Sequence, residues 1–393
     1  MKNLVYPNLS KEVKKYGKFD GRLCYNCGSC TISCPISDDT SAFPRKPIQY
    51  VHIGAKEEIL ASIEPWICHW CGDCSITCPQ KAEPGESMNT IRKYLSSFYD
   101  WTGISSLFNK YWFFKIGLYL FSILFVFGLI AGYHLIYVKF GLKDLFSNSN
   151  IEGLGLEHVF GGDTGRKNIM VWFTVLFFLI PLFLLIINGF RMWYFTMKKN
   201  SKIKIPFSLY ITQLKDLFWL GGTQKKFKEC KEKNMWIRHI TLFAGFLLIS
   251  FIVFFFLKFF QTDKIYPLYH PQRWLGYIAT FLMLYGSVAM ILGRISKKEE
   301  IHKKNDFSDW SLPILTFLVA LSGILIHIFR YAKLEVASHY MFFAHILILA
   351  PLMLIELPFG KLAHLLYHPI ALYFKGIKEK AEKVEEVMEK KVA

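Results

Sequence analysis

Residues 24–35, CYNCGSCTISCP, and residues 68–79, CHWCGDCSITCP, repeat one pattern of four cysteines followed by proline. A [4Fe–4S] cluster takes four thiolates. In two-cluster ferredoxin-type domains three come from one C-x2-C-x2-C run, and the fourth cysteine of that run serves the other cluster. Zinc sites and disulfides give no reason for this spacing. The expected ligand sets are Cys24, Cys27, Cys30 with Cys78, and Cys68, Cys71, Cys74 with Cys34.

The chain beyond the cysteines consists largely of apolar runs, which begin near Tyr111. A helix needs roughly 17–25 apolar residues to cross a bilayer. Six stretches reach that length: 112–138, 170–195, 240–260, 274–293, 312–330 and 340–357. None alternates with a period of two, which favours helices over a barrel. We therefore predict a mainly α fold, with a small α-helical ferredoxin-type domain followed by a six-helix transmembrane bundle.

The formal net charge of +17 is explained by membrane topology rather than by nucleic-acid binding. Lys and Arg number twelve in 191–239 and five in 294–310. The alternate connections 139–168, 261–273 and 330–339 hold four, two and two. No apolar signal segment is expected in residues 1–20. These features predict an inner-membrane, multi-pass protein with both termini and the iron–sulfur domain on the cytoplasmic side.

Histidines in or beside the apolar stretches are candidate haem ligands, because an imidazole inside a membrane is costly unless it binds or pairs. A b-type haem needs two of them at matching depth. His239 and His364 both lie at cytoplasmic ends of their stretches. His345 precedes His364 by roughly 28 Å along a helix, at 1.5 Å per residue, which places it in the outer half. By depth, its best partner is His327 and its second choice is His134. Polar end-groups are expected at His339 and His368.

Two segments resemble known families. CYNCGSCTISCPIS…FPRKPI…WICHWCGDCSITCP, within residues 20–95, resembles the C subunit of heterodisulfide reductase. The segment from His345 through PFGKLAHLLYHP is similar to the last helix of heterodisulfide reductase E subunits and of the cytochrome b subunit of respiratory nitrate reductase. That likeness implies haem ligation by His239, His345 and His364. Residues 247–250, Leu-Leu-Ile-Ser, contain no histidine where the nitrate reductase type has another one, so an outer haem would need a different ligand, such as His327, or be absent.

As a whole, the chain resembles the C subunits of quinone-interacting membrane-bound oxidoreductase complexes. The resemblance implies an iron–sulfur domain at 1–100, a cytochrome b and quinone domain at 111–373, and a charged cytoplasmic tail at 374–393. It further implies one or two haems b, menaquinone as substrate, and soluble flavin/iron–sulfur subunits as partners. Adenylylsulfate reductase is a further expected partner, and sulfate reduction is the expected metabolic context. No catalytic residue or quinone motif is readable in the sequence.

Two alternatives remain open. One is the membrane subunit of a heterodisulfide- or trisulfide-reducing complex, although no adjacent cysteine pair of the type that this chemistry uses is present. The other is a membrane-anchored ferredoxin without haem. The basic loop 198–234 is interpreted as a solvated loop or a docking surface for a soluble partner. Its single thiol, Cys230, is expected to be a bystander.

Overall fold

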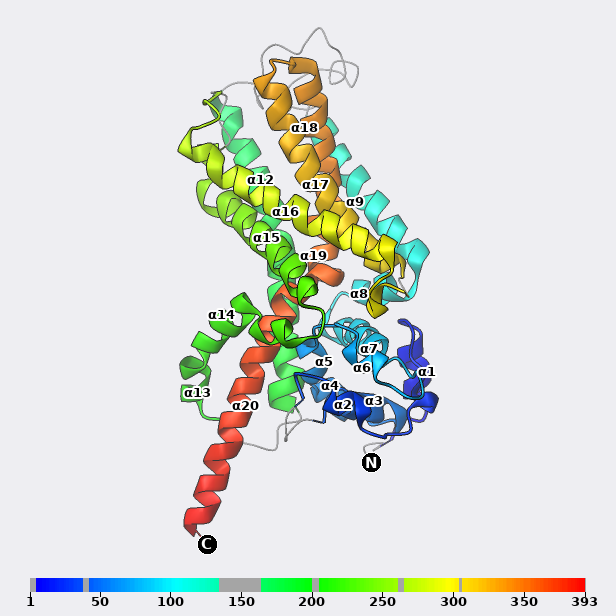
Figure 1. The fold of residues 1–393 in the computed structure, drawn as a ribbon. Coiled ribbons are helices and arrows are strands. Elements are labelled where there is room, and N and C mark those ends of the chain that lie inside the picture. Colours follow the sequence, from blue (N-terminus) through cyan, green and yellow to red (C-terminus); the bar gives the residue numbers. More distant parts are fainter. Residues whose placement is uncertain are drawn as a thin grey trace.

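The computed structural model describes residues 5–37, 42–133, 164–199, 205–260, 265–303 and 306–392. Throughout these ranges the regular structure is helical and no strand occurs. Figure 1 shows a bundle of long helices at one end and a compact group of short helices at the other. The predicted mainly α fold is confirmed. His134 and most of the connection 139–168 lie outside the described residues.

The cysteine-rich part folds into short helices around a small core. In chain order its elements are α1 (Leu9–Lys14), η1 (Gly21–Leu23), α2 (Ser29–Ile32), α3 (Arg45–His52), α4 (Lys56–Ala61), α5 (Glu64–Ile67), α6 (Asp73–Ile76), α7 (Pro84–Tyr99) and α8 (Ile104–Lys110). The amphipathic α7 buries Met88, Ile91 and Leu95, which have no solvent-exposed surface. Burial of these side chains holds the short helices together, since isolated helices of this length are unstable in water.

Six helices are long and apolar enough to cross a membrane. They belong to α9 (Trp112–Tyr133), α12 (Thr164–Trp193) with η4 (Tyr194–Lys199), α15 (Lys233–Phe260), α16 (Pro271–Ser296), α17 (Phe307–Tyr331), and α18 (Glu335–Ala350) with η7 (Pro351–Glu356) and α19 (Leu357–Phe359). These correspond to the six predicted stretches. Many of their large apolar side chains face outward, as in Phe121, Phe255 and Phe281. An apolar outer surface of this kind suits contact with lipid.

Two glycines allow α15 and α16 to pack closely. A Cβ at Gly286 would lie 2.7 Å from the Cβ of Leu242, and one at Gly245 would lie 2.9 Å from the backbone nitrogen of Met283. Small residues at crossing points are the usual means by which membrane helices approach each other. The close contact matters for the site because α15 carries His239.

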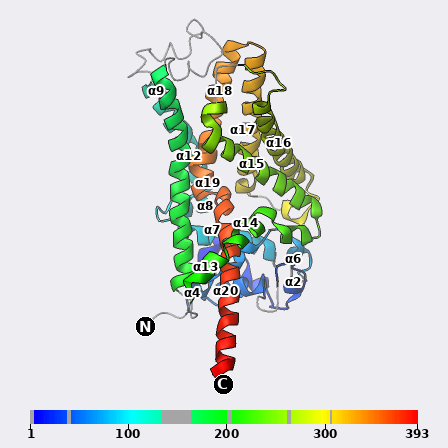
Figure 2. The ribbon, with the colours of Figure 1, turned by 90° about the vertical axis from the view of Figure 1, so that its left-hand side faces the viewer.

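The remaining elements lie where the bundle meets the cysteine-rich part. They are α13 (Phe207–Thr212), α14 (Leu214–Thr223), η5 (Lys225–Glu229), η6 (Glu300–His302), η8 (Lys361–Ala363) and α20 (His364–Val392). The predicted charged tail is not a separate element, because residues 374–392 continue α20 past residue 373 without a break. In Figures 1 and 2 this helix runs from the end of the bundle past the short helices and protrudes beyond them.

Direct contacts join the cysteine-rich part to the bundle. Arg191 of α12 donates hydrogen bonds to the backbone carbonyls of Phe98 and Tyr99, both at 2.8 Å. The Trp66 and Tyr367 rings have their centroids 4.6 Å apart. The arrangement brings the second cysteine motif against the start of α20.

Candidate functional site

The two cysteine motifs adopt the same backbone conformation. Asn26 and Trp70 have φ of 59° and 53°, and Gly28 and Gly72 have φ of 86° and 88°. Glycine enters the left-handed region readily, whereas a bulky residue such as Trp70 rarely does. The turns bring the cysteines of each motif close together in the chain; Cys30, Cys68 and Cys74 are buried, whereas Cys27 is exposed. Each turn then leads into a one-turn helix, α2 or α6, that carries the third cysteine.

The predicted exchange of fourth cysteines is visible in the positions of the thiols. One cavity is lined by Cys34 of the first motif together with Cys68, Cys71 and Cys74 of the second. In the other set, the Cys30 thiol has its pKa raised by burial first and then by the neighbouring Cys24, Cys78 and Cys27. The structure therefore brings together each of the two ligand sets that the spacing predicts.

The surroundings of these thiols suit iron–sulfur ligation. Three of the sulfurs accept N–H hydrogen bonds: Cys24 from Gln49 Nε2 at 3.7 Å, Cys68 from Trp70 N at 3.3 Å, and Cys78 from Ala82 N at 3.3 Å. Such bonds stabilise the negative charge on cluster ligands.

Metal binding must supply free energy to deprotonate the buried thiols. Burial, followed by the nearby Cys68 and Cys71, raises the pKa of Cys34 to about 12. A ligating cysteine is deprotonated, so metal binding and proton release are coupled at such a site. The donor chemistry therefore fits two clusters.

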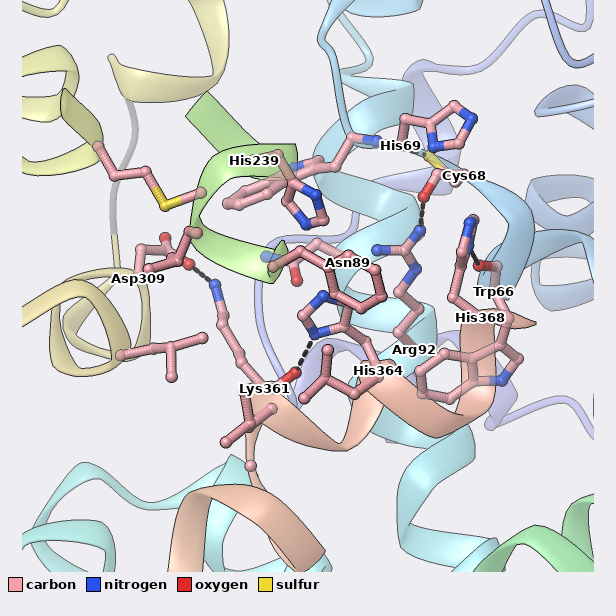
Figure 3. Close-up of a pocket in the computed structure, with 18 of the residues that line it drawn as sticks. Trp66, Cys68, His69, Asn89, Arg92, His239, Asp309, Lys361, His364 and His368 are labelled. Atoms are coloured by element: carbon pink, nitrogen blue, oxygen red, sulfur yellow. Dashed lines mark hydrogen bonds and ion pairs between the residues drawn. The ribbon is translucent and has the colours of Figure 1, made fainter. Parts of the chain in front are cut away.

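A second, larger cavity of about 240 Å³ lies between the second motif and the membrane helices. His239 of α15 and His364 of α20 face it, with ring centroids 5.8 Å apart (Figure 3). Two axial imidazoles on one metal should have centroids about 6 Å apart, taking a metal–nitrogen bond of about 2 Å on each side plus the distance from nitrogen to ring centre. The apolar side chains of Leu242, Phe243 and Phe246 supply part of the wall.

Hydrogen bonds determine which nitrogen of each ring is free. His239 Nδ1 lies 2.8 Å from Gln224 Oε1, and His364 Nδ1 lies 2.5 Å from the Lys361 carbonyl oxygen. Because these oxygens can only accept, Nδ1 carries the proton in both rings and Nε2 keeps its lone pair. Metal-binding histidines are commonly oriented in this way by a partner of the second nitrogen. Both residues therefore fit the haem-ligand role.

The cavity also carries excess positive charge. Arg92, Lys93, Arg294 and Lys361 line it, with Asp309 as the acidic residue in the same wall. Lys361 pairs with Asp309, and burial together with nearby cations places the pKa of Lys361 well below its usual value. The two propionates of a haem, or another anionic group, would complement these cations. The fit of haem b to this cavity thus rests on both the imidazoles and the charge.

His345 and His327 each form a hydrogen bond to a different neighbouring helix. His345 Nδ1 lies 2.8 Å from Ser322 Oγ of α17, whereas His327 Nε2 lies 2.8 Å from the Tyr277 hydroxyl of α16. The nitrogen of His327 that most often binds iron is therefore engaged by Tyr277. The structure does not bring these two imidazoles to a common site, and the outer haem stays a prediction.

Several residues of the site had not been singled out as ligand or cavity residues from the sequence. His368, expected to be a polar end-group, lines the cavity and its Nδ1 donates to the Trp66 carbonyl at 2.7 Å. His69 lies beside it, with ring centroids 5.3 Å apart. Only the four-residue spacing from His364 to His368, which places both on one helix face, was a readable signal. Gln224 and Arg92 carry no such signal.

The fold and the paired thiol sets define a helical protein of the membrane type with a two-cluster iron–sulfur domain. Residues 21–82 match the 4Fe-4S dicluster domain family, which covers the cysteine-rich part and supports an electron-transfer role. No curated protein and no solved structure matches the chain significantly.

Proposed function

We propose that the chain is a membrane electron-transfer subunit that passes electrons between a quinol and a soluble flavin/iron–sulfur partner. Following the family resemblance, the quinol is menaquinol, and the partner belongs to a sulfate-reduction complex. Two [4Fe–4S] clusters and one haem b would supply the one-electron carriers. The residues that would hold them are the eight motif cysteines and the pair His239 and His364.

One observation carries this proposal. The segment Cys68, His69 and Trp70 lines both the cysteine cavity and the histidine cavity. A single wall of protein thus separates the predicted second cluster from the proposed haem site. Redox centres placed on opposite sides of one short segment are close enough for rapid electron exchange.

Side chains on either side of the segment 68–70 fix the positions of the two sites relative to each other. Arg92 of α7 donates a hydrogen bond of 2.6 Å to the Pro65 carbonyl and another to the Cys68 carbonyl. The cation therefore stabilises the backbone beside a predicted cluster thiolate. His368 holds the same segment from the other side, through Trp66. Figure 3 shows the Arg92–Cys68 and His368–Trp66 contacts, which hold this segment from α7 and α20.

In this proposal the cavity handles protons at the cytoplasmic end of the bundle. Quinol oxidation releases protons, and Lys361, which is 21% exposed, forms an ion pair with the buried Asp309 in the cavity wall. Lys93, also in the wall, pairs with Asp306 at 3.1 Å, and that carboxylate is partly exposed. These two ion pairs offer acid–base groups between the cavity and solvent.

The test is a metal and haem inventory of the detergent-solubilised chain, with visible spectra before and after addition of a menaquinol analogue. About eight cluster irons and one haem b that the quinol reduces are expected. Clusters without haem would refute the cytochrome role and leave a membrane-anchored ferredoxin. Haem that the quinol does not reduce would refute the quinone role.

A further inference from the structure

Cys230 is buried against the predicted second cluster rather than standing alone. It lies between η5 and α15, is 2% exposed, and packs with Phe227, Met235 and Ile301. It also lines the cavity that holds Cys34, Cys68, Cys71 and Cys74. A thiol from the connection between two membrane helices thus reaches the cysteine site of the N-terminal domain.

Within the second motif, Cys230 lies closest to Cys71 and Asp73. The sulfurs of Cys230 and Cys71 and a carboxylate oxygen of Asp73 all lie within 4.8 Å of one another. Both sulfurs also line the same small cavity. Next to Cys230, the backbone N–H of Lys231 donates to Asp73 Oδ2 at 3.1 Å. Two consecutive residues of the connection are therefore attached to the second motif.

The first motif has a hydroxyl group beside its second cysteine, and the second motif lacks one. In the equivalent register, the Cys27 sulfur lies 3.5 Å from the hydroxyl of Ser29, two residues later. The second motif has Asp73 at that position. A carboxylate accepts hydrogen bonds and has none to give, so it cannot replace the serine as a donor to a ligand sulfur. Beside Cys71, the Cys230 thiol is the nearby group that can donate to the ligand sulfur, since Asp73 cannot.

A thiolate bound to iron can only accept a hydrogen bond, so in the loaded protein the proton lies on Cys230. We propose that Cys230 is a positioning residue of the second cluster, which donates an S–H hydrogen bond to the Cys71 sulfur and raises the reduction potential of that cluster. The inference rests on the cluster ligation of the proposed function. A donor to a ligand sulfur stabilises the electron-rich reduced state, and hydrogen bonds to the sulfurs are one determinant of cluster potential.

The experiment uses the full-length chain in detergent, with iron content and potentiometric titrations followed by electron paramagnetic resonance. Cys230→Ala should keep both clusters and shift the midpoint potential of one cluster to a more negative value. Cys230→Ser, which still has a hydroxyl donor, should recover most of the shift. The matched control is Ser29→Ala. It should shift the midpoint potential of the cluster held by Cys27 and leave the potential of the cluster held by Cys71 unchanged.

Three results would overturn the inference. Unchanged wild-type potentials for both clusters in Cys230→Ala would mean that the contact has no electronic effect. Loss of about four irons in Cys230→Ala and retention of them in Cys71→Ala would make Cys230 itself the ligand. Equal shifts in Cys230→Ala and Cys230→Ser would reduce the effect to packing. A wild-type chain without clusters would instead refute the proposed function, so the two failures are distinguishable.

Discussion

A buried ion pair inside the bundle offers the sharpest test of how the membrane part is stabilised. Lys115 of α9 and Glu356 at the end of η7 lie 3.2 Å apart, with side chains 2% and 0% exposed. The Glu356 carboxylate also accepts hydrogen bonds from Tyr119, from Ser311 Oγ at 3.0 Å and from the Lys361 backbone N–H at 2.9 Å. The pair therefore supports the turn that leads into His364.

Lys115→Met should destabilise the chain strongly because it leaves Glu356 charged, buried and without its cation. Removing one partner of a buried pair costs about 3–5 kcal/mol. Three hydrogen-bond donors remain on the carboxylate, so the lower end, about 3 kcal/mol, is expected. The measurement is the free energy of unfolding in detergent, from a denaturant titration followed by circular dichroism.

Two further variants make the test specific. Lys303→Met removes an exposed pair with Glu300, 2.6 Å apart, and should cost no more than about 1 kcal/mol. Adding Glu356→Gln to Lys115→Met removes the unpaired charge and should restore much of the loss. A Lys115→Met variant as stable as Lys303→Met, or a double variant no better than the single one, would refute the reasoning.

Three other predictions concern the histidine cavity. His239→Ala and His364→Ala should each abolish haem b absorbance and retain about eight cluster irons; haem absorbance at the wild-type level would exclude the pair as ligands. Gln224→Leu removes the hydrogen-bond partner of His239 and should weaken haem affinity by about 10–100-fold, measured by haem titration of the apoprotein; unchanged affinity would contradict an orienting role. Burial, with the Trp66 carbonyl opposing it, lowers the pKa of His368 to about 4. As the pH falls, the His368 imidazole is protonated in the unfolded chain before it is protonated in the folded one. Its contribution to the free energy of unfolding is therefore fully present above about pH 6.5 and falls by as much as about 3 kcal/mol toward pH 4. His368→Asn should flatten that part of the plot of unfolding free energy against pH, and an identical slope would contradict the assignment.

The sequence predicted those features that depend on local pattern. The spacing C-x2-C-x2-C-x3-C-P is set within a few residues, because one tight turn must direct three thiolates to a single cube. The six spans were also readable, since lipid requires long uninterrupted apolar helices. The ends differ by several residues: the third span begins at Lys233 rather than Ile240. Apolar windows do not detect the polar first turns of a helix.

The side-chain partnerships depended on packing between distant segments. His239 and His364 were matched by depth, but their approach results from the way α15 and α20 meet. Depth also matched His345 with His327, yet in the structure each of them hydrogen-bonds to a different neighbouring helix. A depth estimate contains no information on the rotation of a helix about its axis.

Cys230 shows the same division most clearly. From the sequence it is a single thiol in a basic loop, about 150 residues along the chain from the second motif. Only the tertiary structure brings its sulfur against Cys71, because the connection before α15 folds back over the N-terminal domain. Residue types and spacings determined which metal centres the chain can hold. The long-range packing decided which further side chains surround them, since those contacts join segments that no local pattern relates.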